Sequence, residues 1–166
     1  MSAKVELEGL GALRAKLDEF AEQSLKAAMQ GLSRAGLDII AAAKQNLRSN
    51  TSVVTGQLRA SGRVQKVNGE PNAIDVGFFS NNSANGYAWF VEHGRKPGKM
   101  PPPNIMAQWL RKKHRVPNEE APSRGFALAR KIAREGTQAH PFFEPAVQAN
   151  QDKIEKAISD AVKKTL

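Results

Sequence analysis

The stretch LKAAMQGLSRAGLDIIAAAKQNL, residues 25–47, decides the fold. Its apolar residues recur at helical spacing on one side, at Leu25, Met29, Leu32, Ile39, Ile40, Ala43 and Leu47. Small residues fill the positions between them, which would let a helix lie close against a sheet, with Gly31 and Gly36 as its weak points. The stretch therefore predicts a long helix that packs on a small sheet.

Upstream of this helix the sequence predicts two shorter elements. Residues 4–8 alternate polar and apolar side chains, the period of a strand with one buried face, and glycines then end the run. Leu13, Leu17 and Phe20 follow helical spacing. We expect a short helix from Leu10 and a break near residues 22–24 before the long helix.

Downstream of the long helix the sequence predicts a hairpin. Residues 49–56 indicate a loop, and strands are expected at 58–67, where Leu58 begins the buried face, and at 73–79. The joining turn has the composition Asn-Gly-Glu-Pro. A second polar turn leads to the aromatic stretch 87–92, whose length leaves strand and helix open; we favour a strand or a single turn.

The last third of the chain predicts helices. Four prolines between residues 95 and 104 indicate a loop, and helices are expected at 105–114, with Asn104 as its cap, and at 127–135. Residues 141–145 open a C-terminal helix with core positions at Val147, Ile154, Ile158, Ala161 and Val162. The expected fold is α+β, a single domain (1–166) in which a small antiparallel sheet packs against a long helix and a C-terminal helix, with a helical insertion at 95–138.

Composition narrows the class of protein. The chain of 166 residues has no cysteine, which excludes disulfides and thiolate sites and indicates a reducing cytoplasm as its place of synthesis. No segment approaches the ~18 apolar residues of a membrane span, so no membrane partner is expected. The net charge is +9, and residues 97–140 hold nine basic against three acidic residues. Such a block raises affinity for nucleic acid or is simply a solvated surface.

The patterns that catalysis requires are absent from the sequence. His93, His114 and His140 lie in separate segments without a paired spacing, and no nucleotide-binding glycine pattern or serine elbow occurs. We therefore expect neither an enzyme nor a cofactor. The best acid–base candidate is Glu92 beside His93. We expect instead that Glu92 pairs with a basic side chain or with backbone donors and fixes the local turn.

Three patches of sequence occur in a fixed order. They are Thr55-Gly56-x-Leu58-Arg59-x-Ser61, Tyr87-Ala88-x-x-Val91-Glu92-x-Gly94 and Pro141-Phe142-Phe143-x-Pro145-Ala146. Together they resemble, over nearly the whole chain, the minor tail component family of long-tailed bacteriophages, the tail-completion or head-tail joining proteins. The chain departs from the family pattern at His93, where a bulky apolar residue is common, and in the long stretch 95–138, where compact members have a short loop.

The side chains of each patch also predict a structural role that does not depend on the family. Gly56 can take backbone angles closed to other residues, which suits a turn. The aromatic residues Tyr87, Trp89 and Phe90 are expected in the core or in subunit contacts rather than as ligand stackers. Phe142 and Phe143 are expected to anchor the last helix on the sheet or on a neighbouring subunit.

The resemblance implies assembly rather than turnover. Subunits would close into a ring in the neck of the virion, a hexamer, between the tail tube or tail terminator and the head connector proteins; the isolated protein would be this ring or a monomer. DNA would pass through the ring with non-specific contacts. The residues expected to line the channel or to bind an acidic neighbour are Arg111, Lys112, Lys113 and Arg115. The rival reading is a basic DNA-binding module that reads DNA with the helices at 105–114 and 127–135.

Overall fold

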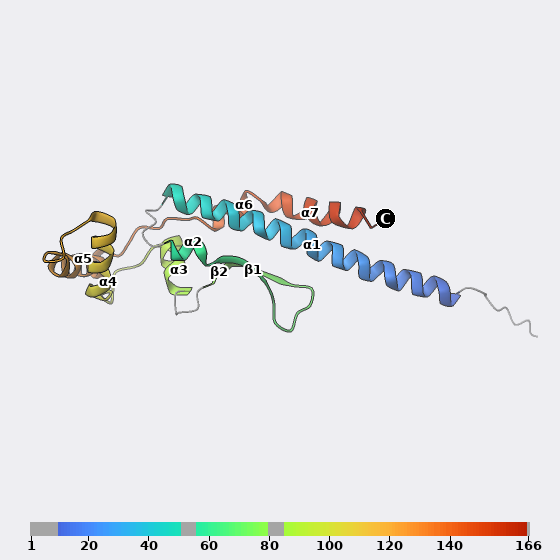
Figure 1. Cartoon of the computed structure of the whole chain (residues 1–166), viewed down its shortest axis with the longest axis horizontal. Helices are drawn as coiled ribbons and strands as arrows, with labels where there is room; N and C mark the ends of the chain where they lie inside the picture. Colours follow the sequence, from blue (N-terminus) through green and yellow to red (C-terminus); the bar gives the residue numbers. More distant parts are fainter. Residues whose placement is uncertain (1–9, 51–55, 80–84, 166) are drawn as a thin grey trace, which may run out of the picture.

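A computed structural model of the protein describes residues 10–50, 56–79 and 85–165. Helix α1 (Leu10–Asn50) runs through 41 residues without interruption (Figure 1), which corresponds to about 60 Å. The predicted long helix is confirmed, and the break expected near residues 22–24 is wrong. Those positions contain neither proline nor glycine, so nothing local ends the helix there. The strand predicted for residues 4–8 lies outside the described residues.

The predicted hairpin is confirmed, with a corrected start. Strands β1 (Gly62–Lys66) and β2 (Ile74–Phe78) pair antiparallel, with Val64 opposite Val76. The first strand does not begin at Leu58, because α2 (Gln57–Ala60) forms one helical turn there. The Ser61 hydroxyl donates to the Leu58 carbonyl oxygen at 2.7 Å, a local bond that closes this turn and competes with strand pairing.

Helix α1 packs closely on two neighbours through its small residues. A Cβ at Gly36 would lie 2.9 Å from a methyl group of Val76 in the hairpin, and one at Gly31 would lie 2.5 Å from the carbonyl oxygen of Ala157. The second contact is with α7 (Gln151–Lys163), which lies alongside α1 (Figure 1). The two glycines are therefore sites of close approach, and the predicted packing of the long helix on the sheet is confirmed.

The C-terminal segment forms two helices rather than the one expected. Helix α6 (Glu144–Gln148) is separated from α7 by Ala149 and Asn150. The buried Asn150 side chain donates to the Ala146 carbonyl oxygen at 2.7 Å, which occupies a backbone group at the end of α6. This local bond turns the chain between the two helices.

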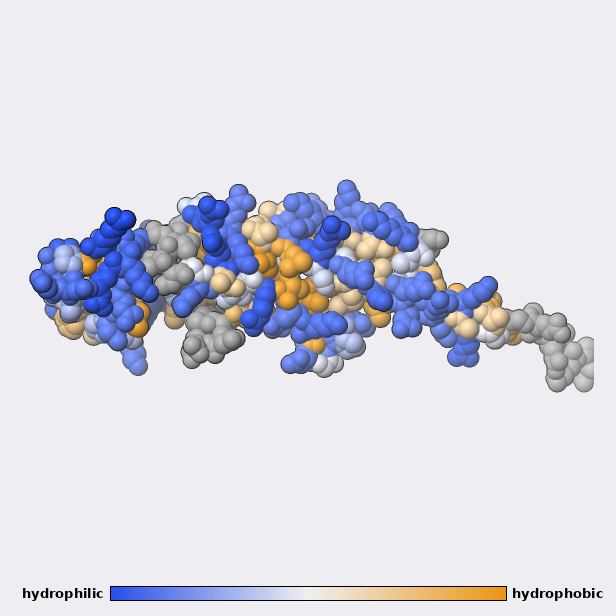
Figure 2. All heavy atoms as spheres, in the orientation of Figure 1, coloured by the Kyte–Doolittle hydropathy of each residue, from blue (hydrophilic) through white to orange (hydrophobic). Residues whose placement is uncertain are grey.

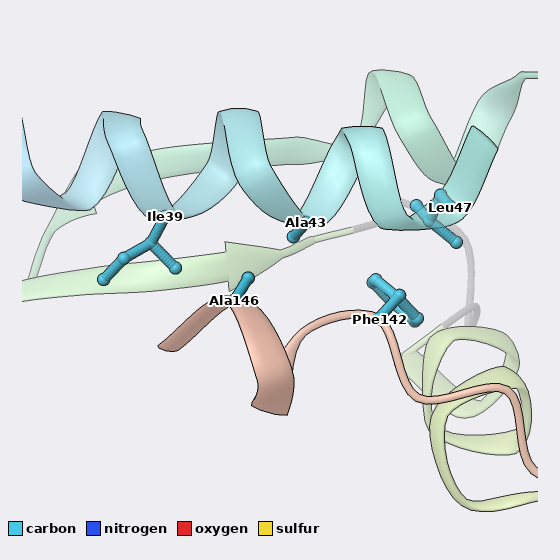
Figure 3. Packing of buried hydrophobic residues seen from close by; sticks show 5 residues of the cluster. All are labelled: Ile39, Ala43, Leu47, Phe142 and Ala146. Carbon is cyan, nitrogen blue, oxygen red and sulfur yellow. The ribbon is translucent and has the colours of Figure 1, made fainter. Parts of the chain in front are cut away.

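The core lies where α1, the hairpin and α6 meet. Figure 3 shows its buried side chains from α1 and from the C-terminal segment: Ile39, Ala43, Leu47, Phe142 and Ala146. Phe142 is 2% exposed, and its ring meets that of Phe78 edge to face at 5.0 Å. Phe143 meets the same ring at 6.0 Å. The two phenylalanines therefore anchor the C-terminal segment on the sheet of their own chain.

The remaining helices correct two predictions. Residues 87–92 belong to helix α3 (Asn85–His93), not to a strand or single turn. Helix α4 (Pro103–His114) lies close to its predicted position, but α5 (Ala121–Glu135) begins six residues before the expected start at 127. Pro122 occupies its first turn, where a missing N–H costs nothing. Its Gly125 sits against the backbone of Ala107, so the contact with α4 stabilises this start.

Helices α4 and α5 form one end of an elongated molecule (Figure 1), and mostly hydrophilic side chains cover that end in the view of Figure 2. They have a small buried cluster of their own, which contains Ala107, Val116 and Ala121. Of the helices in the described ranges, none combines the length and the apolar character that a membrane crossing requires.

Candidate assembly surfaces

Glu92 joins α3 to the C-terminal segment through three hydrogen bonds. Its side chain is 8% exposed. The N–H groups of Phe142 and Phe143 donate to Oε2 of Glu92, and that of Glu144 donates to Oε1, all at 2.9 Å. A carboxylate that accepts N–H groups at the start of a helix is stabilised by their charge-assisted bonds. The prediction that Glu92 binds a basic side chain or backbone donors is confirmed, and the partners are backbone donors.

The second motif divides α3 into two faces. Ala88 and Val91 pack against the core, on the same side as Glu92. Gly94 follows the helix with φ of 73°, and a Cβ there would lie 2.5 Å from the Thr137 carbonyl oxygen, so the motif requires glycine at this position. The remaining sides of the helix carry Tyr87, Trp89 and Phe90, which are 59, 59 and 44% exposed. They are not core residues of this chain, and their expected role in subunit contacts stays a prediction.

The first motif forms the turn into the hairpin. Gly56 has φ of 71° in the left-handed region, as its predicted role in a turn requires, and Leu58 packs against the core from α2. Arg59 is exposed, and Thr55 lies outside the described residues. The described residues of the motif therefore act structurally, because Gly56 turns the chain and Leu58 packs on the core.

An open hollow of about 660 Å³ lies beside the exposed face of α3. Trp89 and Phe90 form one side, and the segment from Gly94 to Lys99 forms another. The Arg95 guanidinium lies 5.7 Å from the centre of the Phe90 ring and donates to the Lys99 carbonyl oxygen. Arg95, Lys96 and Lys99 supply its charge, and none of its lining residues is acidic. The hollow combines aromatic surface with positive charge, which suits an apolar partner that carries carboxylates.

Comparison with known protein families shows the class of protein to which the chain belongs. The family described as "Bacteriophage HK97-gp10, putative tail-component" matches residues 10–94, just over half of the chain. The chain belongs to this family of phage tail components. The predicted resemblance is confirmed, and the protein is a structural component of the phage tail that acts with other virion proteins.

The family match covers the first half of this tail component. It spans α1, the hairpin and α3, and so includes the first two sequence motifs. The third motif lies beyond it, but the bonds from Glu92 join the two parts. Neither the curated proteins nor the solved structures contain a match to the chain.

The basic residues predicted as contacts lie at the end of α4. Arg111, Lys112 and Lys113 occupy its last turn, and Arg115 ends the helix with φ of 52°. The Lys113 ammonium lies 4.7 Å from the centre of the Trp109 ring, which fixes its direction. The four residues lie at the C-terminal end of α4, and none of them lines the hollow beside α3.

The three histidines have separate neighbours. His93 stacks on Trp89 with ring centres 3.7 Å apart, His114 lies against Trp109, and the His140 N–H donates to the Val91 carbonyl oxygen. In the part of the chain that the structure describes, no group of three or more His, Cys, Asp or Glu side chains could hold a metal ion.

Sequence reasoning missed two surfaces. One is the hollow, because the prolines near Arg95, Lys96 and Lys99 indicate a loop but not a surface. The other is the N-terminal part of α1, where Leu10, Leu13, Leu17 and Phe20 stay exposed although their spacing resembles that of a core face. The signal that could have revealed the second surface is length: the C-terminal helix is too short to cover a helix of 41 residues.

Proposed function

We propose that this tail component completes the tail at the head-tail junction, as a non-enzymatic subunit of a ring in the neck of the virion. The observation that supports the proposal is the exposure of large apolar side chains on α1 and α3. Large exposed apolar patches on folded proteins mark contacts with other proteins. In a phage tail component these patches fit an assembly subunit, and a hexameric ring between tail tube and head connector is the arrangement proposed.

Two measurements test this role. Light scattering behind a sizing column, with negative-stain electron microscopy, is expected to find a ring at high protein concentration. In the phage or prophage that encodes the chain, deletion of its coding sequence is expected to leave filled heads and separate tails that do not join. Joined, infectious particles in the deletion strain would exclude the proposed role. Absence of tails altogether would place the protein in tail-tube assembly instead.

The proposal includes a contact for the basic end of α4. Arg111, Lys112, Lys113 and Arg115 would face the DNA channel or an acidic neighbouring protein. A sequence-reading role is not proposed, because residues 115–120 between α4 and α5 exceed the three or four residues of a helix-turn-helix. Binding in the channel would be independent of sequence and would weaken with salt.

Charge-reversal variants distinguish a contact with DNA in the channel from a contact with an acidic neighbouring protein. Lys112→Glu combined with Arg115→Glu should leave the chain folded, since both side chains are exposed, with a loss of about 1–2 kcal/mol because acidic charge is unfavourable at a helix C-terminus. A channel contact predicts loss of salt-dependent DNA binding with rings intact, measured by fluorescence anisotropy. A protein contact predicts unchanged DNA binding and failure to join heads to tails.

A further inference from the structure

Strand β1 has an edge that no other strand of the described residues covers, because the sheet consists of β1 and β2 alone. The Val67 N–H donates to the Ala73 carbonyl oxygen at 3.2 Å, just beyond the paired ends of the two strands. Bonded and non-bonded pairs alternate in an antiparallel ladder. Three residues of β1 therefore point their N–H and carbonyl groups away from β2: Gly62, Val64 and Lys66. A free edge of this kind is a template for a further strand.

An open hollow of about 250 Å³ lies beside this edge. Its lining includes three consecutive residues of β1, 64–66. Because consecutive residues of a strand point to opposite faces, this lining shows that the edge of β1 itself borders the hollow. Helix α1 supplies Ser33 and Leu37, and the Leu37 side chain is 58% exposed. The hollow therefore places apolar surface beside the outward backbone groups of β1.

Residues 4–8 have the sequence pattern that fits this edge. They alternate polar and apolar side chains, which predicts a strand with one buried face, and they lie outside the described residues. In a strand added to β1, Val5 and Leu7 would share one face and would cover Leu37. The polar residues of the segment would then lie on the opposite face, away from α1.

The charges on that opposite face agree with this placement. Arg63 lies on the face of β1 away from α1 and is exposed. Within the described ranges, no acidic side chain forms a salt bridge with it. The segment would bring Glu6 and Glu8 to this face, together with Lys4 at its start. Asp75 lies on β2, one strand further from the added strand, so the nearest charge of the hairpin is basic.

The length of α1 keeps a copy's own segment away from its own hairpin. Helix α1 begins at Leu10, and Leu37 follows 27 residues later, a distance of about 40 Å along the helix. A fully extended chain puts Leu7 at most about 11 Å from Leu10, and Val5 at most about 18 Å. Figure 1 shows the N-terminal part of α1 extending beyond the hairpin. A segment 4–8 that pairs with β1 must therefore come from another copy.

We propose that residues 4–8 of one copy add as a third strand to the free edge of β1 in the next copy, with Val5 and Leu7 over the hollow. The partner is a second copy of this chain, because the chain supplies a segment of matching alternation and charge that its own fold holds out of reach. The contact joins different surfaces of two copies, so repeated contacts can close into a ring. The inference rests on the proposed ring and names the segment and the edge that join its subunits.

Engineered disulfides test the contact, because the natural sequence has no cysteine. Leu37→Cys in one chain is mixed with Val5→Cys or Leu7→Cys in a chain of different tag length, and the mixture is oxidised. Leu37 is exposed, so folding should be unaffected. The matched control is Glu6→Cys, which lies in the same segment but would face away from Leu37, and a disulfide requires Cβ atoms about 4 Å apart. At least one of the two apolar positions should give several-fold more mixed dimer than the control.

Charge exchange supplies a second test of the same contact. Arg63→Glu in the chain with Leu37→Cys should lower the yield of the mixed dimer several-fold. Glu6→Lys with Glu8→Lys in the other chain should restore it, whereas a general loss of folding would not be rescued. An unchanged yield with Arg63→Glu would contradict the placement of the acidic face beside β1.

The outcomes separate the contact from the ring. A wild-type ring that forms while Val5→Cys and Leu7→Cys both stay at the level of Glu6→Cys would overturn the contact and leave the proposed function standing. A disulfide within one chain that carries both Leu7→Cys and Leu37→Cys would show that the segment binds its own copy. In assembled tails, a cysteine-to-amine crosslink from Leu37→Cys to a protein of different mass would assign the edge of β1 to another virion protein and also overturn the inference. Absence of every oligomer, together with normal joining in the deletion strain, would remove both proposals.

Discussion

Replacement of Glu92 by glutamine tests the link between α3 and the C-terminal segment. In the native chain Oε2 accepts N–H groups from Phe142 and Phe143, and Oε1 accepts that of Glu144. Glu92→Gln keeps the shape of the side chain but removes its charge. The single remaining oxygen can face the first two donors, and the new amide NH₂ group then points at the N–H of Glu144, donor against donor.

The expected loss follows from these three bonds. A hydrogen bond to a charged group contributes about 1.5–3 kcal/mol, and one to a neutral group about 1 kcal/mol. Glutamine weakens two bonds and leaves one nearly buried donor without an acceptor. The free energy of unfolding should therefore fall by about 2–4 kcal/mol, and the Tm by roughly 5–12 °C for a chain of this size. Glu92→Ala, which leaves all three donors without an acceptor, should cost more.

Urea and thermal unfolding followed by circular dichroism measure the effect, at a protein concentration where the oligomeric state is constant. Glu155→Gln on the exposed side of α7 is the matched control and should change the free energy by less than about 0.5 kcal/mol. If Glu92→Gln behaved like this control, the carboxylate would not hold the C-terminal segment, and the structural explanation of the Val-Glu-x-Gly motif would be refuted.

Two further predictions concern packing. Phe142→Ala should lower the free energy of unfolding by about 3–5 kcal/mol in a urea titration, because the ring fills the centre of the core; Phe143→Ala should cost less, and equal losses would contradict this. Gly125→Ala should destabilise α4 and α5 by about 1–3 kcal/mol, seen as faster amide exchange there, because the new methyl group would lie 2.6 Å from a backbone nitrogen of α4. Gly36→Ala meets side-chain methyl groups of Val64 and Val76 rather than backbone atoms and gains helix propensity, so it should cost less than Gly125→Ala; the reverse order of the two glycines would count against this reasoning.

The sequence predicts those elements whose hydrophobic pattern matches their burial. The period of Ile39, Ala43 and Leu47 predicts α1 and its inner face, and the alternation around Val64 and Val76 predicts the hairpin. Both patterns are local, and local patterns need no knowledge of the rest of the chain. The family motifs predict the order of these features along the chain, but they do not predict which motifs contact one another.

Helix α3 shows why the same reasoning fails at the candidate site. Its buried face contains the charged residue Glu92 beside Ala88 and Val91, and its largest apolar side chains, Trp89 and Phe90, are exposed, so hydrophobicity does not follow burial along this helix. A hydrophobic pattern cannot reveal such a helix. The donors that stabilise Glu92 lie about 50 residues further along the chain. The sequence could therefore suggest that Glu92 binds backbone N–H groups, but not which ones.

The predicted insertion at 95–138 begins and ends at neighbouring residues. The Arg95 N–H donates to the Thr137 carbonyl oxygen at 3.0 Å, and the Thr137 N–H donates back to Arg95 at 2.8 Å. A pair of residues joined by two backbone hydrogen bonds in this way flanks the two-residue turn of a β-hairpin. Deletion of residues 97–135 together with Lys96→Asn would leave an asparagine–glycine pair between Arg95 and Thr137. The glycine of this pair is Gly136, which already has φ of 78°. Asparagine–glycine is a favoured sequence for this turn.

The shortened chain should fold like the intact frame, because the buried cluster of α4 and α5 is separate from the core around Phe142. We expect cooperative urea unfolding with a free energy within about 1 kcal/mol of the full chain, since loop length changes closure entropy only slowly. Amide exchange should show α1 and α7 protected as before. Full-length Lys96→Asn is the control. Loss of protection in α1 with the control intact would mean that α4 and α5 support the frame, and that residues 95–138 are part of the fold rather than an insertion into it.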